Sequence, residues 1–256
     1  MSDFSVWNGI FESFESAQGA PDVFIDRIWI DKQKAKISSR LETFRKVDCT
    51  SSLSLTRDYP LATFVAAELV RAQSLHLLDV GGGMGEQFLE ILARVPEAEE
   101  KLNYTILENA SLNSGIPSEL RRFQNLRFIS ELSELPSGLD MIHFGSSLQY
   151  VDDWRSFIKS LVESTSVKNV VISDFLAGDI PHFVTLQKYG ERNIPIRMYN
   201  ENDFNTYLSQ FGFVLTYRSY YDSRVLNQEF LPNSALPEKY RIKKPLNLVF
   251  SRGERK

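Results

Sequence analysis

Short apolar runs alternate along this chain with segments whose apolar residues recur at helical spacing. The apolar runs predict strands at 75–80, 103–108, 126–130, 139–144, 168–174, 213–220 and 245–251. The helical spacing predicts helices at 85–95, 117–122, 152–163 and 201–211. This alternation is typical of an α/β fold, a mainly parallel sheet with helices on both faces. The last two strands have no helix between them, so we expect an antiparallel pair at the sheet edge.

Residues 1–58 do not share this alternation. They begin with an aromatic-rich piece, WNGIFESF, and continue into polar, helix-forming stretches between Val23 and Val47. We therefore expect a helical N-terminal cap over 1–58 and one main domain over 59–256. The main domain begins with YPLATFVAAELVRA, whose spacing predicts a helix opened by Pro60.

The composition is that of an ordinary globular chain with a mildly acidic balance. Of the 256 residues 43% are hydrophobic and 24% charged, which is enough to bury one large core. The formal net charge of −4 argues against nucleic acid as a partner. Cys49 is the single cysteine, so no internal disulfide can form, and neither a leader-like N-terminus nor a membrane-length apolar run is apparent. We expect a cytoplasmic protein without an integral membrane segment.

The stretch LLDVGGGMGEQFLEIL runs from a predicted strand through a glycine-rich turn into a predicted helix. Such turns bind nucleotide-like ligands, because glycine lets the backbone approach closely and the helix N-terminus offers unpaired N–H groups. Gly81, Gly83 and Gly85 form a G-x-G-x-G pattern. The G-x-G-x-x-G of dinucleotide sites is absent because residue 86 is Glu. Asp79 and Glu86 flank the turn, which favours a positively charged ligand over a pyrophosphate.

The end of the next strand carries a second signal. In nucleotide-binding α/β proteins a carboxylate at this point accepts hydrogen bonds from a ribose diol. The strand NYTILEN places Glu108 there, and Ser130 and Glu131 follow the third strand, within reach of an adenine edge. These residues together predict a nucleoside ligand whose ribose is bound by Glu108.

This order of motifs resembles that of class I S-adenosylmethionine-dependent methyltransferases. LLDVGGGMG is similar to the first motif of that family, ILEN to its ribose-binding acid, and LDMIHFGSSLQYVDDW to its fourth-strand segment. The resemblance implies a Rossmann-like, seven-stranded sheet with six parallel strands and one antiparallel strand, and S-adenosyl-L-methionine as the cofactor. It also implies that Gly145 and Ser146 line the amino-acid end of the cofactor, while Gln149 and Tyr150 face its methyl group.

A narrower resemblance covers nearly the whole chain. An N-terminal aromatic-x-Gly-x-aromatic pattern, a Leu-Gln-Tyr triplet after the fourth strand and an aromatic-x-Arg ending are similar to proteins assigned as methyltransferases in bacterial surface-polysaccharide (lipopolysaccharide or capsule) clusters. The N-terminal residues concerned are Trp7, Gly9, Phe11, Ser13, Phe14 and Ala17. The chain departs from that group at 174–177, where DFLA replaces Asp-Arg-x-Pro. The resemblance implies O-methylation of a sugar or sugar-linked acceptor in surface-glycan biosynthesis.

Methyl transfer to a hydroxyl needs an aligned acceptor, exclusion of water and a base. Residues 175–200 are predicted to be a long loop that acts as a substrate lid. The candidate catalytic residues are Asp174 at the end of the fifth strand, His182 in the loop, and Tyr150, for which packing is an equal alternative. No metal site is predicted, because the three histidines lie far apart in sequence and Cys49 has no partner.

Other functions share these motifs. A small-molecule or natural-product O- or N-methyltransferase would carry the same cofactor residues. A non-catalytic module that binds S-adenosylmethionine in a glycan-assembly complex would do so too, and the sequence shows no clear base. Glu86 disfavours a nicotinamide-dependent oxidoreductase. The sequence specifies neither the acceptor nor whether the chain forms a homodimer.

Overall fold

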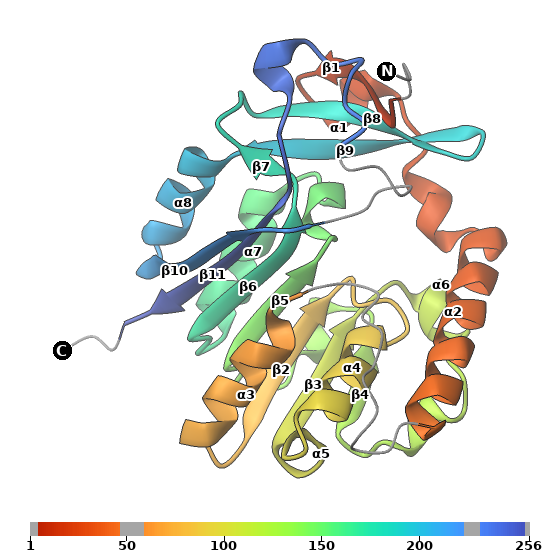
Figure 1. Ribbon diagram of the computed structural model, residues 1–256, viewed down its shortest axis with the longest axis vertical. Helices are drawn as coiled ribbons and strands as arrows, with labels where there is room; N and C mark the ends of the chain where they lie inside the picture. Colours follow the sequence, from red (N-terminus) through yellow and green to blue (C-terminus); the bar gives the residue numbers. More distant parts are fainter. Residues whose placement is uncertain (1–4, 47–58, 223–230, 254–256) are drawn as a thin grey trace. The chain divides into compact units, whose positions relative to one another are not determined.

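The computed structural model describes residues 5–46, 59–222 and 231–253 (Figure 1). These residues pack as two compact units. We call residues 24–46, 59–145 and 165–171 the glycine-turn unit, and residues 5–23, 146–164, 172–222 and 231–253 the hairpin unit. No helix in this described part combines the length and the apolar character that a membrane crossing requires.

A seven-stranded sheet has the order β10-β11-β6-β5-β2-β3-β4. Its strands are β2 (Leu75–Val80), β3 (Leu102–Leu107), β4 (Leu126–Ile129), β5 (Met141–Gly145), β6 (Asn169–Phe175), β10 (Phe213–Tyr220) and β11 (Leu246–Arg252). β2 runs parallel to β3 and β5, β3 runs parallel to β4, and β10 and β11 are antiparallel. The α/β class predicted from the apolar runs, and the Rossmann-like, seven-stranded sheet that the resemblance implied, are therefore confirmed.

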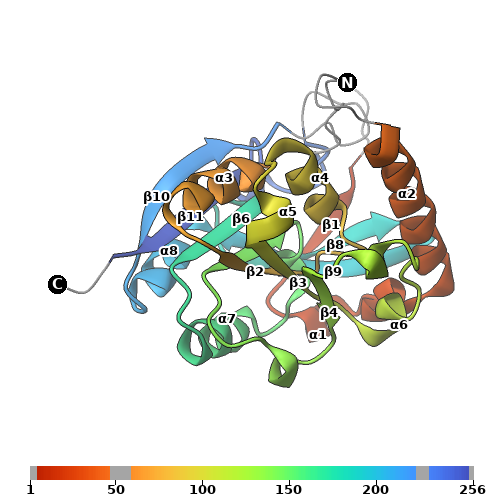
Figure 2. The same cartoon turned by 90° about the horizontal axis from the view of Figure 1, so that it is seen from below.

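Helices of the glycine-turn unit follow the predicted pattern with one exception. They are α2 (Arg27–Lys46), α3 (Leu61–Arg71), α4 (Glu86–Arg94), α5 (Ala98–Lys101) and α6 (Ala110–Asn113), with short 3₁₀ helices at Leu120–Arg122 and Leu132–Glu134. α3, α4 and α5 contact one another and lie on the same face of the sheet (Figure 2). The helix predicted at 117–122 is wrong. The N–H groups of Leu120 and Phe123 donate to the carbonyls of Pro117 and Leu120, three residues back, so the segment forms a 3₁₀ turn instead.

The hairpin unit contains a second, four-stranded sheet with the order β1-β8-β9-β7. Its elements are β1 (Trp7–Phe11), α1 (Phe14–Ala17), α7 (Trp154–Ser164), β7 (Ala177–Gly178), β8 (Phe183–Tyr189), β9 (Arg192–Asn200) and α8 (Glu201–Ser209), with 3₁₀ helices at Pro21–Ile25, Leu148–Tyr150 and Glu238–Tyr240. The strands β10 and β11 also belong to this unit.

Two expectations about secondary structure are wrong in this unit. Residues 175–200 are not an irregular loop, because β8 and β9 form an antiparallel hairpin that turns at Gly190 with φ +60°. The N-terminal piece is not wholly helical either, since WNGIF is the strand β1 and pairs with β8. The buried rings of Trp154, Tyr199 and Phe204 support this sheet, with ring centroids 5.2 to 5.8 Å apart.

Candidate functional site

The glycine turn after β2 has a conformation that explains the spacing of its glycines. Gly81, Gly83 and Gly85 have φ angles of +68°, +59° and +93°, a region that side-chain-bearing residues rarely adopt. The N–H of Gly81 donates to the carbonyl of Leu107 at 2.9 Å, which fixes the turn to the end of β3. Gly85 is the N-terminal cap of α4. The G-x-G-x-G pattern is therefore explained by three left-handed backbone positions in one turn.

Glu108 lies directly after β3 and points at this turn. Its Oε2 accepts a hydrogen bond from the N–H of Gly83 at 3.3 Å, and its Oε1 accepts from the backbone N–H and the side-chain Nδ2 of Asn109, both at 2.9 Å. Burial raises the pKa of the Glu108 carboxyl, and these three N–H donors lower it, with a net increase. The predicted ribose-binding acid is therefore beside the predicted turn.

Asp79 lies beneath the turn. Its side chain is only 1% exposed. The Tyr104 hydroxyl donates to Asp79 Oδ2 at 2.6 Å, and Nδ1 of His143 lies 2.8 Å from Asp79 Oδ1. A Cβ atom built on Gly82 would overlap Asp79 Oδ2, so the carboxylate packs against the turn backbone. Asp79, the predicted cofactor contact, thus supports the glycine turn from below.

Helix α2 passes over the same turn and neutralises one of its flanking acids. Nζ of Lys36 lies 2.6 Å from Oε2 of Glu86, at the start of α4. Oε1 of Gln33 is 3.7 Å from the place where a Cβ atom on Gly83 would stand. The sequence analysis took Asp79 and Glu86 together as favouring a positively charged ligand. The structure adds that the Glu86 carboxylate is paired with Lys36.

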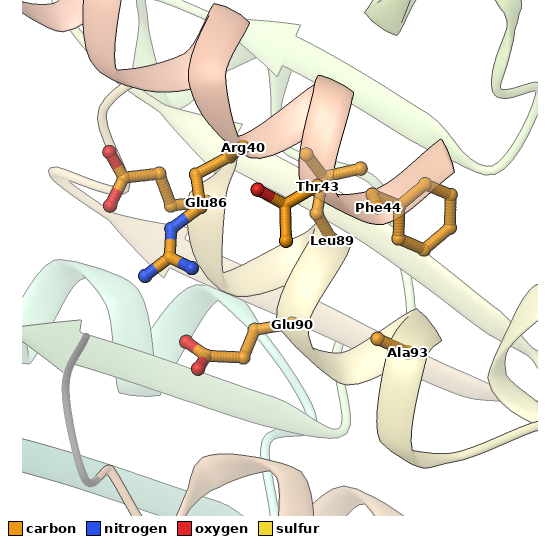
Figure 3. A pocket seen from close by; sticks show the side chains of 7 residues that line it. All are labelled: Arg40, Thr43, Phe44, Glu86, Leu89, Glu90 and Ala93. Atoms are coloured by element: carbon orange, nitrogen blue, oxygen red, sulfur yellow. The ribbon is translucent and has the colours of Figure 1, made fainter. Parts of the chain in front are cut away.

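A pocket lies between α2 and α4 (Figure 3). Figure 3 shows the Arg40 guanidinium directed between the carboxylates of Glu86 and Glu90. The lining residues are Arg40, Thr43, Phe44, Glu86, Leu89, Glu90 and Ala93. None of the residues predicted to bind a nucleoside is among them, so this pocket is separate from the Glu108 side of the turn.

The residues predicted to reach an adenine edge lie at the end of β4. Ser130 is half-buried, and its hydroxyl accepts a hydrogen bond from Nδ2 of Asn113 at 2.8 Å. Glu131 is exposed, and the backbone N–H groups of both residues donate to Oε2 of Glu134. Asn113 also donates to the carbonyls of Glu108 and Ile129, at 3.3 and 3.1 Å.

Sequence reasoning missed Asn109 and Asn113. Asn109 binds the Glu108 carboxylate, and Asn113 links the ends of β3 and β4. The signal that could have identified Asn109 is its place directly after the strand, where its side chain caps α6 by accepting from the N–H of Leu112 at 2.8 Å.

The remaining cofactor candidates follow β5. Gly145 closes the glycine-turn unit, and a Cβ atom there would stand 2.7 Å from Cε1 of His143. Ser146 and Gln149 belong to the hairpin unit, where Nε2 of Gln149 donates to the Ser146 hydroxyl at 3.0 Å. Ser146 has a left-handed backbone, with φ +58°. Gln149 is 2% exposed, and its buried Oε1 accepts no hydrogen bond within the described residues.

Tyr150 and Asp174, two of the catalytic candidates, also lie in the hairpin unit. The Tyr150 hydroxyl donates to Oε1 of Gln187, on β8, at 3.1 Å. Asp174 is half-buried at the end of β6 with φ +53°, and its N–H donates to Oδ1 of Asn247 at 3.3 Å. In the part of the chain that the structure describes, no three His, Cys, Asp or Glu side chains gather as a metal site would require.

His182, the third catalytic candidate, is engaged by a buried arginine. Because a guanidinium has donors only, Nη1 of Arg197 donates to Nε2 of His182 at 3.2 Å. Nη2 of Arg197 donates to the carbonyl and Oδ1 of Asp152 at 3.0 and 3.1 Å. Burial, and then the charge of Arg197, lower the pKa of His182 to about 4. A neutral imidazole whose lone pair is already bonded is poorly suited to take a proton from an acceptor hydroxyl.

Comparison with solved structures identifies the architecture. Mitomycin 7-O-methyltransferase MmcR aligns over 94% of this chain and 64% of its own, with 13% identity and a TM-score of 0.54. Burkholderia thailandensis 1,6-didemethyltoxoflavin-N1-methyltransferase, solved with S-adenosylhomocysteine, aligns over 92% of this chain and 91% of its own, with 14% identity and a TM-score of 0.50. The chain has the class I methyltransferase fold. No family model and no curated protein matches it by sequence.

Proposed function

We propose that the protein is an S-adenosylmethionine-dependent methyltransferase. The observation that carries this proposal is the hydrogen bond between Glu108 and the N–H of Gly83, which joins a ribose-binding carboxylate to a turn of three left-handed glycines. The fold supports it, because class I methyltransferases bind their cofactor at the carboxyl ends of the strands that carry these residues.

The donor set fits the cofactor. Among the described residues, a Cβ atom on Gly83 would come near Gln33 alone, at 3.7 Å from its Oε1, which leaves room for a ligand on that side of the turn. Glu108 would accept hydrogen bonds from the ribose hydroxyls, and the buried charge of Asp79 would favour a cationic ligand at the turn. S-adenosylmethionine supplies an electrophilic methyl group on a sulfonium. The chain's own residues would hold the nucleoside, align the acceptor and exclude water.

Calorimetric titration with S-adenosylhomocysteine tests the cofactor assignment. We expect saturable binding to the parent protein and a loss of at least about tenfold in Glu108→Ala, because a buried charged acceptor is removed. Glu100→Ala is the matched control, since that carboxylate is exposed on α5 and is not among the predicted cofactor residues, so the affinity should change little. If the parent protein shows no binding, the proposed function is wrong.

We further propose that the acceptor is a hydroxyl of a sugar or sugar-linked molecule in cytoplasmic steps of bacterial surface-glycan biosynthesis. The whole-chain resemblance supports this, and its two motifs meet in the hairpin unit. Trp7 of the N-terminal motif lies opposite Gln187 in the β1–β8 pair, and Gln187 accepts the hydrogen bond of Tyr150 from the second motif. The four-stranded sheet is therefore our candidate for the acceptor side.

Asp174 is our candidate base in this reaction. A left-handed backbone is costly for a residue with a side chain and is common at functional sites. A carboxylate at the carboxyl end of β6 could accept a proton from an acceptor hydroxyl. His182 is left without this role, because Arg197 occupies its Nε2.

Methyl-transfer assays with nucleotide-sugars and with aromatic small molecules separate the acceptor classes. The two solved neighbours are named as enzymes of mitomycin and of a toxoflavin precursor, which keeps a small-molecule acceptor as the second candidate. We expect turnover with a sugar acceptor, a large decrease in kcat for Asp174→Asn and little change for His182→Gln. Turnover with aromatic acceptors alone would favour the second candidate. Cofactor binding without turnover on either set would favour a non-catalytic binding module.

A further inference from the structure

His143 occupies an unusual position for a core histidine. It lies in the middle of β5 and is 0% exposed. Its neighbour across the parallel β2–β5 pair is Asp79, whose Oδ1 lies 2.8 Å from His143 Nδ1. Its place inside an apolar strand would by itself suit a simple packing role. The contacts of its ring are more specific than that.

The imidazole touches two strand ends at once. On one side it binds Asp79, whose carboxylate packs against the backbone at Gly82, inside the glycine turn. On the other side its Cε1 would lie 2.7 Å from a Cβ atom on Gly145, which allows only glycine there. The ring of Tyr59 holds the imidazole from a third direction, with centroids 5.8 Å apart. His143 therefore spans the gap between the turn after β2 and the backbone at the end of β5.

We propose that His143 is a positioning residue for the cofactor, an inference that rests on the proposed function. Through Asp79 it fixes the glycine turn, and through its ring edge it fixes the Gly145 backbone. These two segments would enclose the amino-acid end of S-adenosylmethionine. No atom of His143 needs to touch the ligand.

Two residues bond to Asp79, and they allow the effect on the glycine turn to be separated from the effect on the Gly145 backbone. Tyr104 donates the other hydrogen bond to Asp79, from β3, and the three atoms nearest to a Cβ atom on Gly145 belong to His143 and Tyr59. Loss of the Tyr104 hydroxyl would disturb the turn alone, whereas loss of the imidazole would disturb both segments. An unpaired hydrogen-bonding position at a buried carboxylate is costly, so the turn should shift when a donor is removed.

The experiment compares three substitutions by calorimetric titration with S-adenosylhomocysteine and by thermal unfolding. His143→Leu removes the donor to Asp79, and we expect affinity to fall by at least about tenfold. His143→Asn keeps an amide N–H near the place of Nδ1, and we expect it to recover most of that loss. Tyr104→Phe should weaken binding less than His143→Leu does. His76→Asn is the control, because His76 lies in the same sheet on β2 and does not contact the turn.

The result that overturns the proposal is parent-like affinity in both His143 variants while the parent protein binds. An equal loss in His143→Asn and His143→Leu also overturns it, because a general packing defect would not be rescued by a conserved donor. If His143→Leu does not fold, the affinities of the other three variants are compared. Weaker binding in His143→Asn and Tyr104→Phe than in His76→Asn supports the proposal, and equal binding in all three overturns it. Absence of binding in the parent protein is a separate result, which removes the proposed function itself.

Discussion

At the scale of single residues, the conformations around the glycine turn explain why these residue types occur there. The three alternate glycines have positive φ, and a left-handed backbone costs other residues about 1–2 kcal/mol each. Gly82, between them, is required for a different reason, since a side chain there would collide with Asp79. The sequence pattern identified the three alternate glycines. It gave no reason for a glycine at position 82, because that constraint comes from the buried side chain of Asp79.

Glu108 should make cofactor binding depend on pH. Burial raises the pKa of its carboxyl above the ordinary value of 4.5, and only the charged form accepts hydrogen bonds from a ribose diol at both oxygens. We expect the affinity for S-adenosylhomocysteine to fall as the pH is lowered from about 7.5 to about 5, beginning above the range of an ordinary glutamate. Calorimetry across this range measures the effect.

Glu108→Gln is the control for this prediction, because it should bind weakly without that pH dependence. A raised acid pKa also means that the folded state holds the proton more tightly than the unfolded chain. The contribution of Glu108 to stability is therefore full below pH 4.5 and is lost as the pH rises through the folded-state pKa. Equal pH dependence in the parent and Glu108→Gln would contradict the assignment.

His182 should affect stability in the opposite direction. Its pKa falls from 6.5 to about 4 in the folded protein, so the unfolded chain binds more protons between these values. The contribution of the neutral ring is full above about pH 6.5 and is lost as the pH falls through about 4. We expect the free energy of unfolding to decrease over this window, and less steeply in His182→Gln. Denaturant titrations at several pH values test this, and identical slopes in the two proteins would refute it.

At the scale of secondary structure, the apolar pattern predicted the seven-stranded sheet well and the second sheet poorly. Central strands such as β2 are buried along nearly their whole length and read as continuous apolar runs. The hairpin β8–β9 mixes apolar residues with Gln187, Lys188 and Arg197, and it contains Pro195, so no simple period marks it. Its best local signal was Gly190 in a two-residue turn.

The strand β1 explains why the N-terminal aromatic motif is not helical. Trp7 is 4% exposed and lies opposite Gln187, so this strand completes the four-stranded sheet from a distant part of the sequence. No periodicity within the first residues could reveal that partner. The prediction of a helical cap is confirmed for Arg27–Lys46, which form α2, but it missed the strand β1 because the β1–β8 pairing is a tertiary contact.

The energetic contribution of β1 can be measured at Trp7. We expect Trp7→Ala to lower the free energy of unfolding by about 3–5 kcal/mol, because a buried indole is replaced by a cavity. Trp7→Phe should cost less, since Nε1 of Trp7 makes no hydrogen bond within the described residues. Ile10→Ala on the same strand is the control, because Ile10 is 38% exposed. Similar losses for Trp7→Ala and Ile10→Ala in denaturant titrations would show that β1 is not anchored by its tryptophan.

At the scale of the whole molecule, the candidate residues divide between the two compact units. The turn, Glu108, Asp79 and His143 belong to the glycine-turn unit, and Tyr150, Asp174 and His182 belong to the hairpin unit. The grouping of Glu108 with the glycine turn was predictable because these residues follow strands at fixed places in a repeated α/β pattern. The four-stranded sheet of the hairpin unit was not, because it depends on pairings such as β1–β8, which link segments remote in sequence.

Binding of the cofactor product should raise the thermal stability of the protein. A ligand that binds only the folded state, at about 100 times its Kd, stabilises it by about 2.7 kcal/mol. For a chain of this size that corresponds to an increase in Tm of about 5–10 °C. We expect this shift with S-adenosylhomocysteine in the parent protein and, at the same ligand concentration, a shift of about half that size or less in Glu108→Ala. NAD should produce none, since Glu86 stands where a dinucleotide turn has its third glycine and is held there by Lys36. An equal shift with NAD would mean that the turn after β2 accepts a pyrophosphate, and the assignment of a sulfonium cofactor would then have to be abandoned.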